Sequence, residues 1–132
     1  MKTRHLIGVI TILFLLSIVI GGCEKRELAR PPAGTGTVFQ KSLPETYDAA
    51  RESLVKLEFH IVKEEAGYIE GVYPRSVNSK GEAKGEHVGV WIDSRDRYSA
   101  RVLIDTLKTP KEIKKQKEWR QDVLRKMMEI LR

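Results

Sequence analysis

Two runs of alternating apolar and polar residues in the second half of the chain constrain its fold more than any other feature. Residues 88–93 and 98–105 carry an apolar side chain at every second position. Successive side chains of a strand point to opposite faces, so this period predicts two strands that each bury one face. The polar stretch Ser94-Arg95-Asp96-Arg97 predicts a turn that joins them into a hairpin. The predicted inward side chains are those of Val88, Val90, Ile92, Tyr98, Ala100, Val102 and Ile104.

Two amphipathic helices are predicted, one before and one after this hairpin. Ser42 and Glu45 have the spacing of a capping box, and apolar residues then recur every three or four positions over four turns. Thr109 and Glu112 repeat that spacing before a second helix, predicted from Pro110 to residue 130 or 131. Its first half is mostly charged, whereas its second half carries an apolar stripe that is typical of a packed face.

Shorter strands are predicted at residues 37–41, 59–65 and 68–74, and residues 75–85 have the composition of a loop. The pattern of 68–74 leaves two registers open, with either Ile69 and Tyr73 or Tyr68 and Val72 inward. Together the elements follow the order β-α-β-β-β-β-α. They predict an α+β fold, a two-layer sandwich in which an antiparallel sheet of four to five strands carries two helices on one face.

The first 23 residues have the organisation of a secretory signal. Lys2 and Arg4 precede 15 uncharged, mostly apolar residues at 6–20, which lead through two glycines to Cys23, the only cysteine. As a helix those 15 residues would span about 22 Å, which is short against a hydrocarbon core of about 30 Å. An uncleaved membrane anchor is the alternative reading. The paired glycines favour cleavage.

The quartet Ile20-Gly21-Gly22-Cys23 resembles the lipobox of bacterial lipoproteins. This resemblance implies that residues 1–22 are removed and that Cys23 carries the lipid, with acyl chains such as palmitate. Residues 23–36 are then a lipidated tether, because they contain charge, proline and glycine but no apolar period. Residues 37–132 form the domain. Glu24 after the cysteine implies, by resemblance to Gram-negative lipoproteins, delivery to the outer membrane, with the domain facing the periplasm.

Charge and residue chemistry favour binding over catalysis. Basic residues outnumber acidic ones nine to four between positions 108 and 132, whereas the preceding domain is nearly neutral. His60 and His87 begin strands without a ligand-pair spacing, and Asp93 and Asp96 flank a turn, where aspartate is favoured for structural reasons. No catalytic residue, metal ligand or cofactor is therefore predicted. Nucleic acid is not an expected partner, because an exported chain without interleaved stacking aromatics lacks the usual features.

Two candidate contact sites remain. The lysines near the start of the second helix could lie against anionic headgroups, although an ordinary solvated helix face is the alternative. Trp91 and Leu103 fall on the sheet face opposite the helices, where they could form a patch for an envelope protein partner unless residues 75–85 cover them. The lysines in question are Lys108, Lys111, Lys114, Lys115 and Lys117.

The layout resembles a family of small bacterial lipoproteins whose domain has no known function. The likeness includes Phe59-His60-Ile61-Val62, Tyr68-Ile69-Glu70-Gly71 and the lead-in Gln116-Lys117-x-Trp119 to the terminal helix. It implies a membrane-tethered accessory domain. We therefore expect a non-catalytic envelope lipoprotein anchored through Cys23. The alternative is a small-ligand carrier or enzyme that uses a cavity between helices and sheet.

Overall fold

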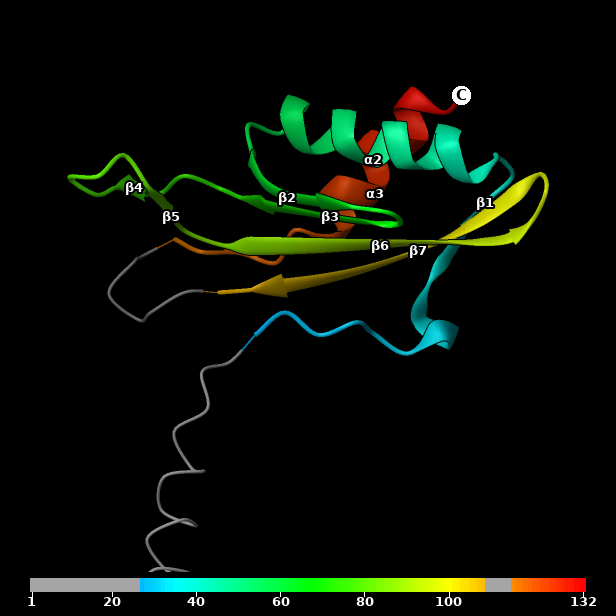
Figure 1. Ribbon diagram of the computed structural model, residues 1–132, viewed down its shortest axis with the longest axis horizontal. Coiled ribbons are helices and arrows are strands. Elements are labelled where there is room, and N and C mark those ends of the chain that lie inside the picture. Colours follow the sequence, from blue (N-terminus) through cyan, green and yellow to red (C-terminus); the bar gives the residue numbers. More distant parts are fainter. Residues whose placement is uncertain (1–26, 109–114) are drawn as a thin grey trace, which may run out of the picture.

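The computed structural model describes residues 27–108 and 115–132, and its centre is a five-stranded antiparallel sheet of order β1-β7-β6-β3-β2. Helices α2 (Leu43–Lys56) and α3 (Arg120–Ile130) lie together over one face of this sheet (Figure 1). The fold is α+β with two layers, as the sequence predicts. The strands are β1 (Thr37–Phe39), β2 (His60–Glu65), β3 (Tyr68–Val72), β6 (His87–Asp96) and β7 (Ser99–Leu107).

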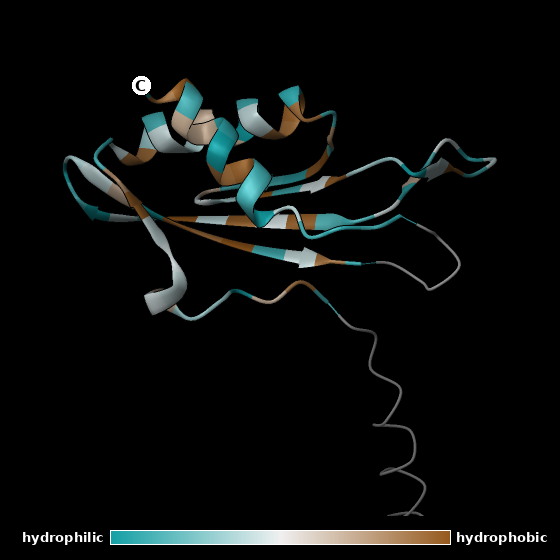
Figure 2. Ribbon diagram, turned by 180° about the vertical axis from the view of Figure 1, so that it is seen from behind, coloured by the Kyte–Doolittle hydropathy of each residue, from teal (hydrophilic) through white to brown (hydrophobic). Residues whose placement is uncertain are grey.

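The β6–β7 hairpin is the longest pairing in the sheet, and its alternation of apolar and polar residues is visible in Figure 2. Val90 pairs with Ile104, and both lie in the core beneath the helices. Pairing continues to Asp96 and Ser99, so the turn falls later than predicted. The Asp96 carboxylate accepts the N–H of Tyr98 at 2.8 Å and holds this tighter turn. Tyr98 was predicted to point inward, and that prediction is wrong because its side chain is 72% exposed at the tip.

Helix α2 follows the predicted pattern. The hydroxyl of Ser42 accepts the N–H of Glu45, and Pro44 lies in the first turn, where a missing N–H costs nothing. Ala50 and Leu54 are completely buried against the sheet. On β3 the register with Ile69 in the core is the correct one of the two predicted alternatives, and Tyr73 packs against the same core.

Helix α3 begins ten residues later than predicted, at Arg120, and the predicted capping box lies outside the described residues. Residues 115–119 are not helical, and two of their backbone donors bind side chains in or beside the sheet. The N–H of Lys117 donates to Glu86 Oε1 at 2.9 Å, and that of Trp119 donates to Thr106 Oγ1 at 3.3 Å. Tertiary hydrogen bonds thus replace the i→i−4 bonds that the local sequence favours.

The predicted loop at 75–85 contains two short strands, β4 (Ser76–Val77) and β5 (Ala83–Lys84), which form a separate small sheet. Their connection is ordered by Asn78, whose side-chain oxygen accepts the N–H groups of Lys80 and Glu82 at 2.9 Å each. This arm projects beyond the end of the main sheet (Figure 1).

Candidate functional site

The face of the sheet opposite the helices, here called the outer face, carries the two side chains predicted to form a partner patch, Trp91 and Leu103. One row across it contains Tyr68, Trp91 and Leu103, which are paired along neighbouring strands. The rings of Tyr68 and Trp91 lie 4.9 Å apart at 40°. Trp91 is half-buried and lies over Gly89, where a Cβ would come within 2.8 Å of the indole. Gly89 therefore makes room for the tryptophan.

An N-terminal strap, residues 27–36, runs across the outer face (Figure 1). The N–H of Ala29 donates to the Asp105 carboxylate at 2.9 Å, and Arg30 forms an ion pair with Asp93. The guanidinium of Arg120 donates to the carbonyl of Thr35. From residue 27 onward the chain is therefore part of the domain and not the extended tether expected from its composition, because side chains of β6, β7 and α3 hold it.

The strap also covers part of the predicted patch. Leu103 is 1% exposed. A Cβ at Gly36 would lie 2.8 Å from Leu103 Cδ2, so the strap backbone passes directly over this leucine. The expectation of an exposed pair Trp91–Leu103 is thus wrong for Leu103. The segment over Leu103 is the strap and not residues 75–85, which project away from the sheet (Figure 1).

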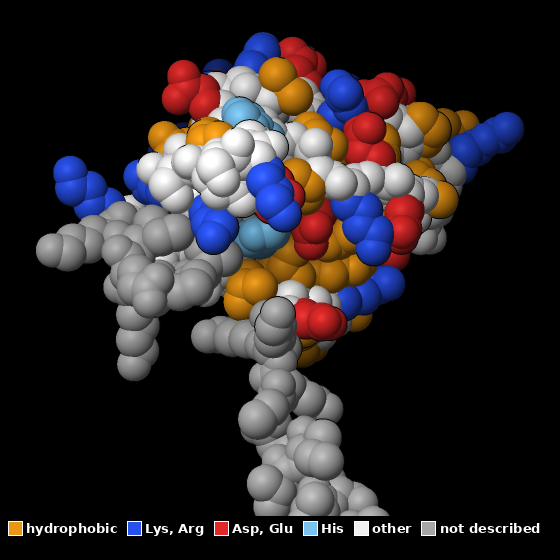
Figure 3. Space-filling view, turned by 60° about the vertical axis from the view of Figure 1, so that its left-hand side comes forward, with side chains coloured by type: hydrophobic (Ala, Val, Ile, Leu, Met, Phe, Trp, Pro, Cys, Tyr) orange, Lys and Arg blue, Asp and Glu red, His pale blue; other side chains and the backbone are white. Residues whose placement is uncertain are grey.

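A cavity of about 420 Å³ opens between the start of the strap and the outer face, and we call it the outer-face cavity. It brings His87 together with the carboxylates of Glu27 and Glu70. The position of His87 at the start of a strand gave no indication of this proximity. Figure 3 views the end of the molecule where β6 begins and β7 ends, and apolar side chains there are surrounded by charged ones and histidine. The cavity is lined by Glu27, Leu28, Lys63, Tyr68, Glu70, His87 and Leu107.

Tyr68 is the polar centre of this cavity. Its hydroxyl lies 3.1 Å from Glu70 Oε1, to which it donates. Burial raises the pKa of Tyr68 well above its ordinary value, and the negative charge of Glu70 raises it further. The phenol therefore stays protonated at physiological pH and acts as a hydrogen-bond donor, not as a base.

The predicted lysines separate into three groups. Lys108 follows β7 directly and is exposed, and Lys115 is exposed where the described chain resumes. Lys117 is already engaged, because its Nζ lies 3.2 Å from the Asp122 carboxylate and 4.0 Å from the centre of the Trp119 ring. Lys111 and Lys114 lie outside the described residues, as does Cys23.

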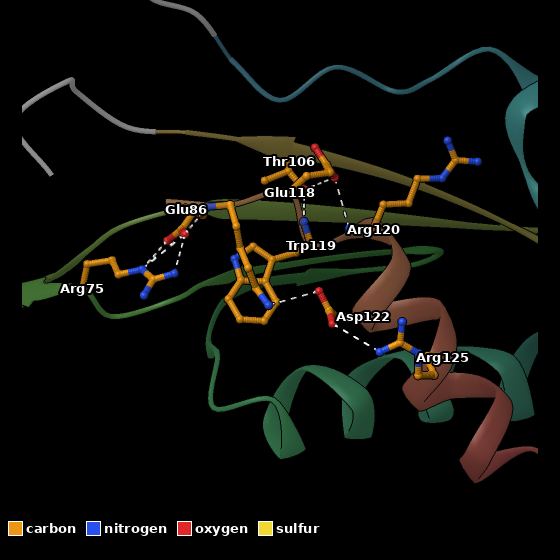
Figure 4. Close-up of polar contacts among 9 residues, drawn as sticks. Arg75, Glu86, Thr106, Glu118, Trp119, Arg120, Asp122 and Arg125 are labelled. Carbon is orange, nitrogen blue, oxygen red and sulfur yellow. Dashed lines mark hydrogen bonds and ion pairs between the residues drawn. The ribbon is translucent and has the colours of Figure 1, made fainter. Parts of the chain in front are cut away.

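A buried ion pair, which sequence analysis missed, fixes residues 115–119 to the sheet (Figure 4). Glu86 is 0% exposed and accepts Arg75 Nη2 at 2.8 Å, Arg75 Nε at 3.1 Å and the N–H of Lys117. Burial alone would raise the pKa of Glu86, but these hydrogen bonds outweigh it and lower the pKa below its ordinary value. We call this arrangement the Glu86 clasp. Its carboxylate is ionised and engaged by neighbouring donors, which favours a structural role over a chemical one.

Trp119 lies beside the clasp in an aromatic cluster. Its ring centre is 4.9 Å from that of Phe59 and 4.7 Å from that of Tyr73, and the Arg75 guanidinium lies 4.4 Å above the Tyr73 ring. Within the described part of the chain, the indole N–H of Trp119 is buried without a hydrogen-bond partner. The clasp and this cluster therefore join the end of the sheet to the entry of α3.

A second hollow, of about 680 Å³, lies between the first turns of α2 and the turn joining β2 to β3. Leu43, Pro44 and Tyr47 form its apolar side, and Asp48, Glu64 and Glu65 its acidic side. It is a surface groove next to the helix layer, and neither His60 nor His87 lines it. The outer-face cavity, which His87 lines, lies on the opposite side of the sheet from the predicted ligand space.

Two further observations concern residues 27–108 and 115–132 alone. They contain no cluster of three or more histidine, cysteine or acidic residues placed to hold a metal ion. No helix among them has the length and apolar character needed to cross a membrane.

Comparison with models of known protein families gives no match, and a search of curated proteins gives none either. The fold and the site together define a small α+β domain whose open sheet face is crossed by its own N-terminal strap. The chemistry of this chain's own residues is therefore the basis for assigning a function.

Proposed function

We propose that this chain is a lipid-anchored protein of the bacterial cell envelope, held in the outer membrane and facing the periplasm, whose domain serves as a non-catalytic binding or structural module. The observation that carries the proposal is the quartet Ile20-Gly21-Gly22-Cys23 after an uncharged, mostly apolar run of 15 residues. A thiol is the nucleophilic group to which a diacylglyceryl unit can be attached. Each buried methylene contributes about 0.8 kcal/mol, so two or three acyl chains hold a protein on a bilayer where one would not.

The attachment of residues 27–36 to the sheet supports this proposal. Glu27 lies four residues after Cys23, so at most about 14 Å of extended chain separates the two. Because residues 27–36 are bound to the sheet, the domain would be held close to the lipid surface and not at the end of a 13-residue tether. A close anchor suits a domain that acts on or beside the membrane.

The use of charged groups supports a binding module over an enzyme. Glu86, whose carboxylate is the most buried among the described residues, is engaged by Arg75 and by the backbone of Lys117. Asp93 and Asp105 hold the strap. These carboxylates are used to attach one part of the chain to another, which is an architecture suited to presenting a surface.

Replacement of Cys23 by Ser tests the anchor. We expect wild-type protein expressed in a Gram-negative cell to incorporate radiolabelled palmitate and to sediment with membranes, and the C23S variant to lose the label and to remain unprocessed. A matched control adds Ser79→Cys, at an exposed position of the projecting arm, to the C23S variant. This control restores a thiol outside the quartet and should stay unlabelled. Palmitate incorporation in C23S would contradict the proposal.

A further inference from the structure

The start of the strap and the end of the sheet meet at one place on the domain. Glu27 and Leu28 line the outer-face cavity together with His87, the first residue of β6, and Leu107, the last of β7. Cys23 can lie no farther than about 14 Å from Glu27. An acylated Cys23 would therefore bring this end of the domain next to the lipid surface.

The strap also restricts how the domain can turn about that anchor. It is attached at separate points, by the Ala29 N–H to Asp105 on β7 and by Arg30 to Asp93 on β6. A third contact joins Thr35 to Arg120 on α3. Several attachments along one segment fix its direction relative to the sheet, so the first residue of the strap has a defined place on the domain.

Two exposed lysines, Lys108 and Lys115, lie near this end of the sheet, beside a cavity that Glu27 and Glu70 line, and these two cations are the groups suited to an anionic surface. Lys108 directly follows Leu107, and Lys115 is within about 7 Å of Lys117, whose N–H is bound to Glu86 beside the start of β6. Both lysines are exposed, and neither has an ion-pair partner within the described ranges. Cations attract an anionic leaflet strongly only within a Debye length of about 8 Å, so their position near the anchor decides whether they act.

We propose that the sheet end at which β6 begins and β7 ends docks on an anionic phospholipid surface, with Lys108 and Lys115 against the headgroups and the helix layer turned away. This inference rests on the proposed lipid anchor and adds an orientation and a lipid preference to it. Lys117 is not part of this surface, because its ammonium group forms an ion pair with Asp122.

Depth-dependent fluorescence quenching tests the orientation on the lipidated full protein in vesicles. His60 is exposed and lies in the same strand row as His87 and Leu107, whereas Glu52 is exposed on α2. Each is replaced in turn by Cys and labelled with the fluorophore NBD. The label goes only to the introduced cysteine, because the Cys23 sulfur would carry lipid and could not react. The vesicles contain phosphatidylcholine with about 30% phosphatidylglycerol and a headgroup-attached quencher. We expect at least twofold stronger quenching at position 60 than at position 52.

Substitution of Lys108 and Lys115 tests whether their charges hold this end of the domain against anionic headgroups. We expect K108Q/K115Q to remove at least half of the difference in quenching between positions 60 and 52, and pure phosphatidylcholine vesicles to do the same for the unsubstituted protein. Equal quenching at both positions, or a difference that K108Q/K115Q leaves unchanged, would overturn the proposal. Flotation of the same samples with the vesicles reports the anchor separately, so failure of the proposed function and failure of this inference are distinguishable.

Discussion

The attachment of the C-terminal segment depends on the carboxylate of Glu86. It is shielded from solvent and accepts three N–H groups, two from Arg75 and one from the backbone of Lys117. A buried charge is tolerated only when it is paired and hydrogen-bonded, and removing one member leaves the other uncompensated. The clasp therefore joins the arm at residue 75 to the segment that leads into α3.

We predict that Glu86→Gln lowers the free energy of unfolding by about 2–4 kcal/mol at pH 7, because it leaves Arg75 without its charge partner. The pKa of Glu86 is lower in the folded state than its ordinary value of 4.5, so the clasp stabilises fully above that value and loses its contribution as the pH falls through the folded-state pKa. The difference between wild type and E86Q should therefore shrink in acid.

Denaturant unfolding at pH 7 and at pH 3 checks this prediction. Glu82→Gln is the matched control, because Glu82 is exposed on the same arm and its removal should cost no more than about 0.5 kcal/mol. A loss in E86Q no larger than in E82Q, or one that grows in acid, would contradict the role assigned to the clasp. No local sequence signal marks Glu86, because a lone glutamate after a glycine-rich loop has the composition of a solvated turn.

At the scale of elements, the strap and the entry to α3 are the features that local sequence could not predict. The strap lacks apolar periodicity because its contacts are single polar bonds to Asp93, Asp105 and Arg120. The segment before α3 has helix-favouring lysines and a capping box, but side chains of the sheet take its backbone donors. Both depend on residues distant in sequence. By contrast, α2 and the β6–β7 pairing were predicted because their signals are local and periodic.

We predict that Gly36→Val loosens the strap. A Cβ at Gly36 would lie 2.6 Å from Arg101 Cγ and 2.8 Å from Leu103 Cδ2, and Leu103 is buried, so the added side chain must displace the strap. Gly34→Val is the matched control, because nothing lies within 4 Å of a Cβ there. Hydrogen exchange should become faster at Ala29, whose N–H donates to Asp105, in G36V and stay near wild type in G34V. Similar rates in both variants would show that the strap does not depend on this close approach.

At the scale of the whole molecule, the layers follow from the sequence and the functional face does not. The alternation in 88–93 and 98–105, together with the shorter strands and the apolar stripes of the two predicted helices, was enough to predict an antiparallel sheet with both helices on one side. Two features of the outer face were not predictable: the burial of Leu103, and the cavity that His87 shares with Glu27 and Glu70. Both depend on the strap, which lies outside the predicted domain of residues 37–132. A polar segment that packs through isolated bonds carries no pattern that a single sequence displays.

The intact mass of the protein extracted from cell membranes tests the central claim most directly. The account predicts a chain that begins at Cys23 and carries a diacylglyceryl group and an additional acyl chain, with no species that retains residues 1–22. A membrane-extracted protein whose mass corresponds to the unprocessed chain from Met1, or to residues 23–132 without lipid, would contradict both the anchor and the orientation that depends on it.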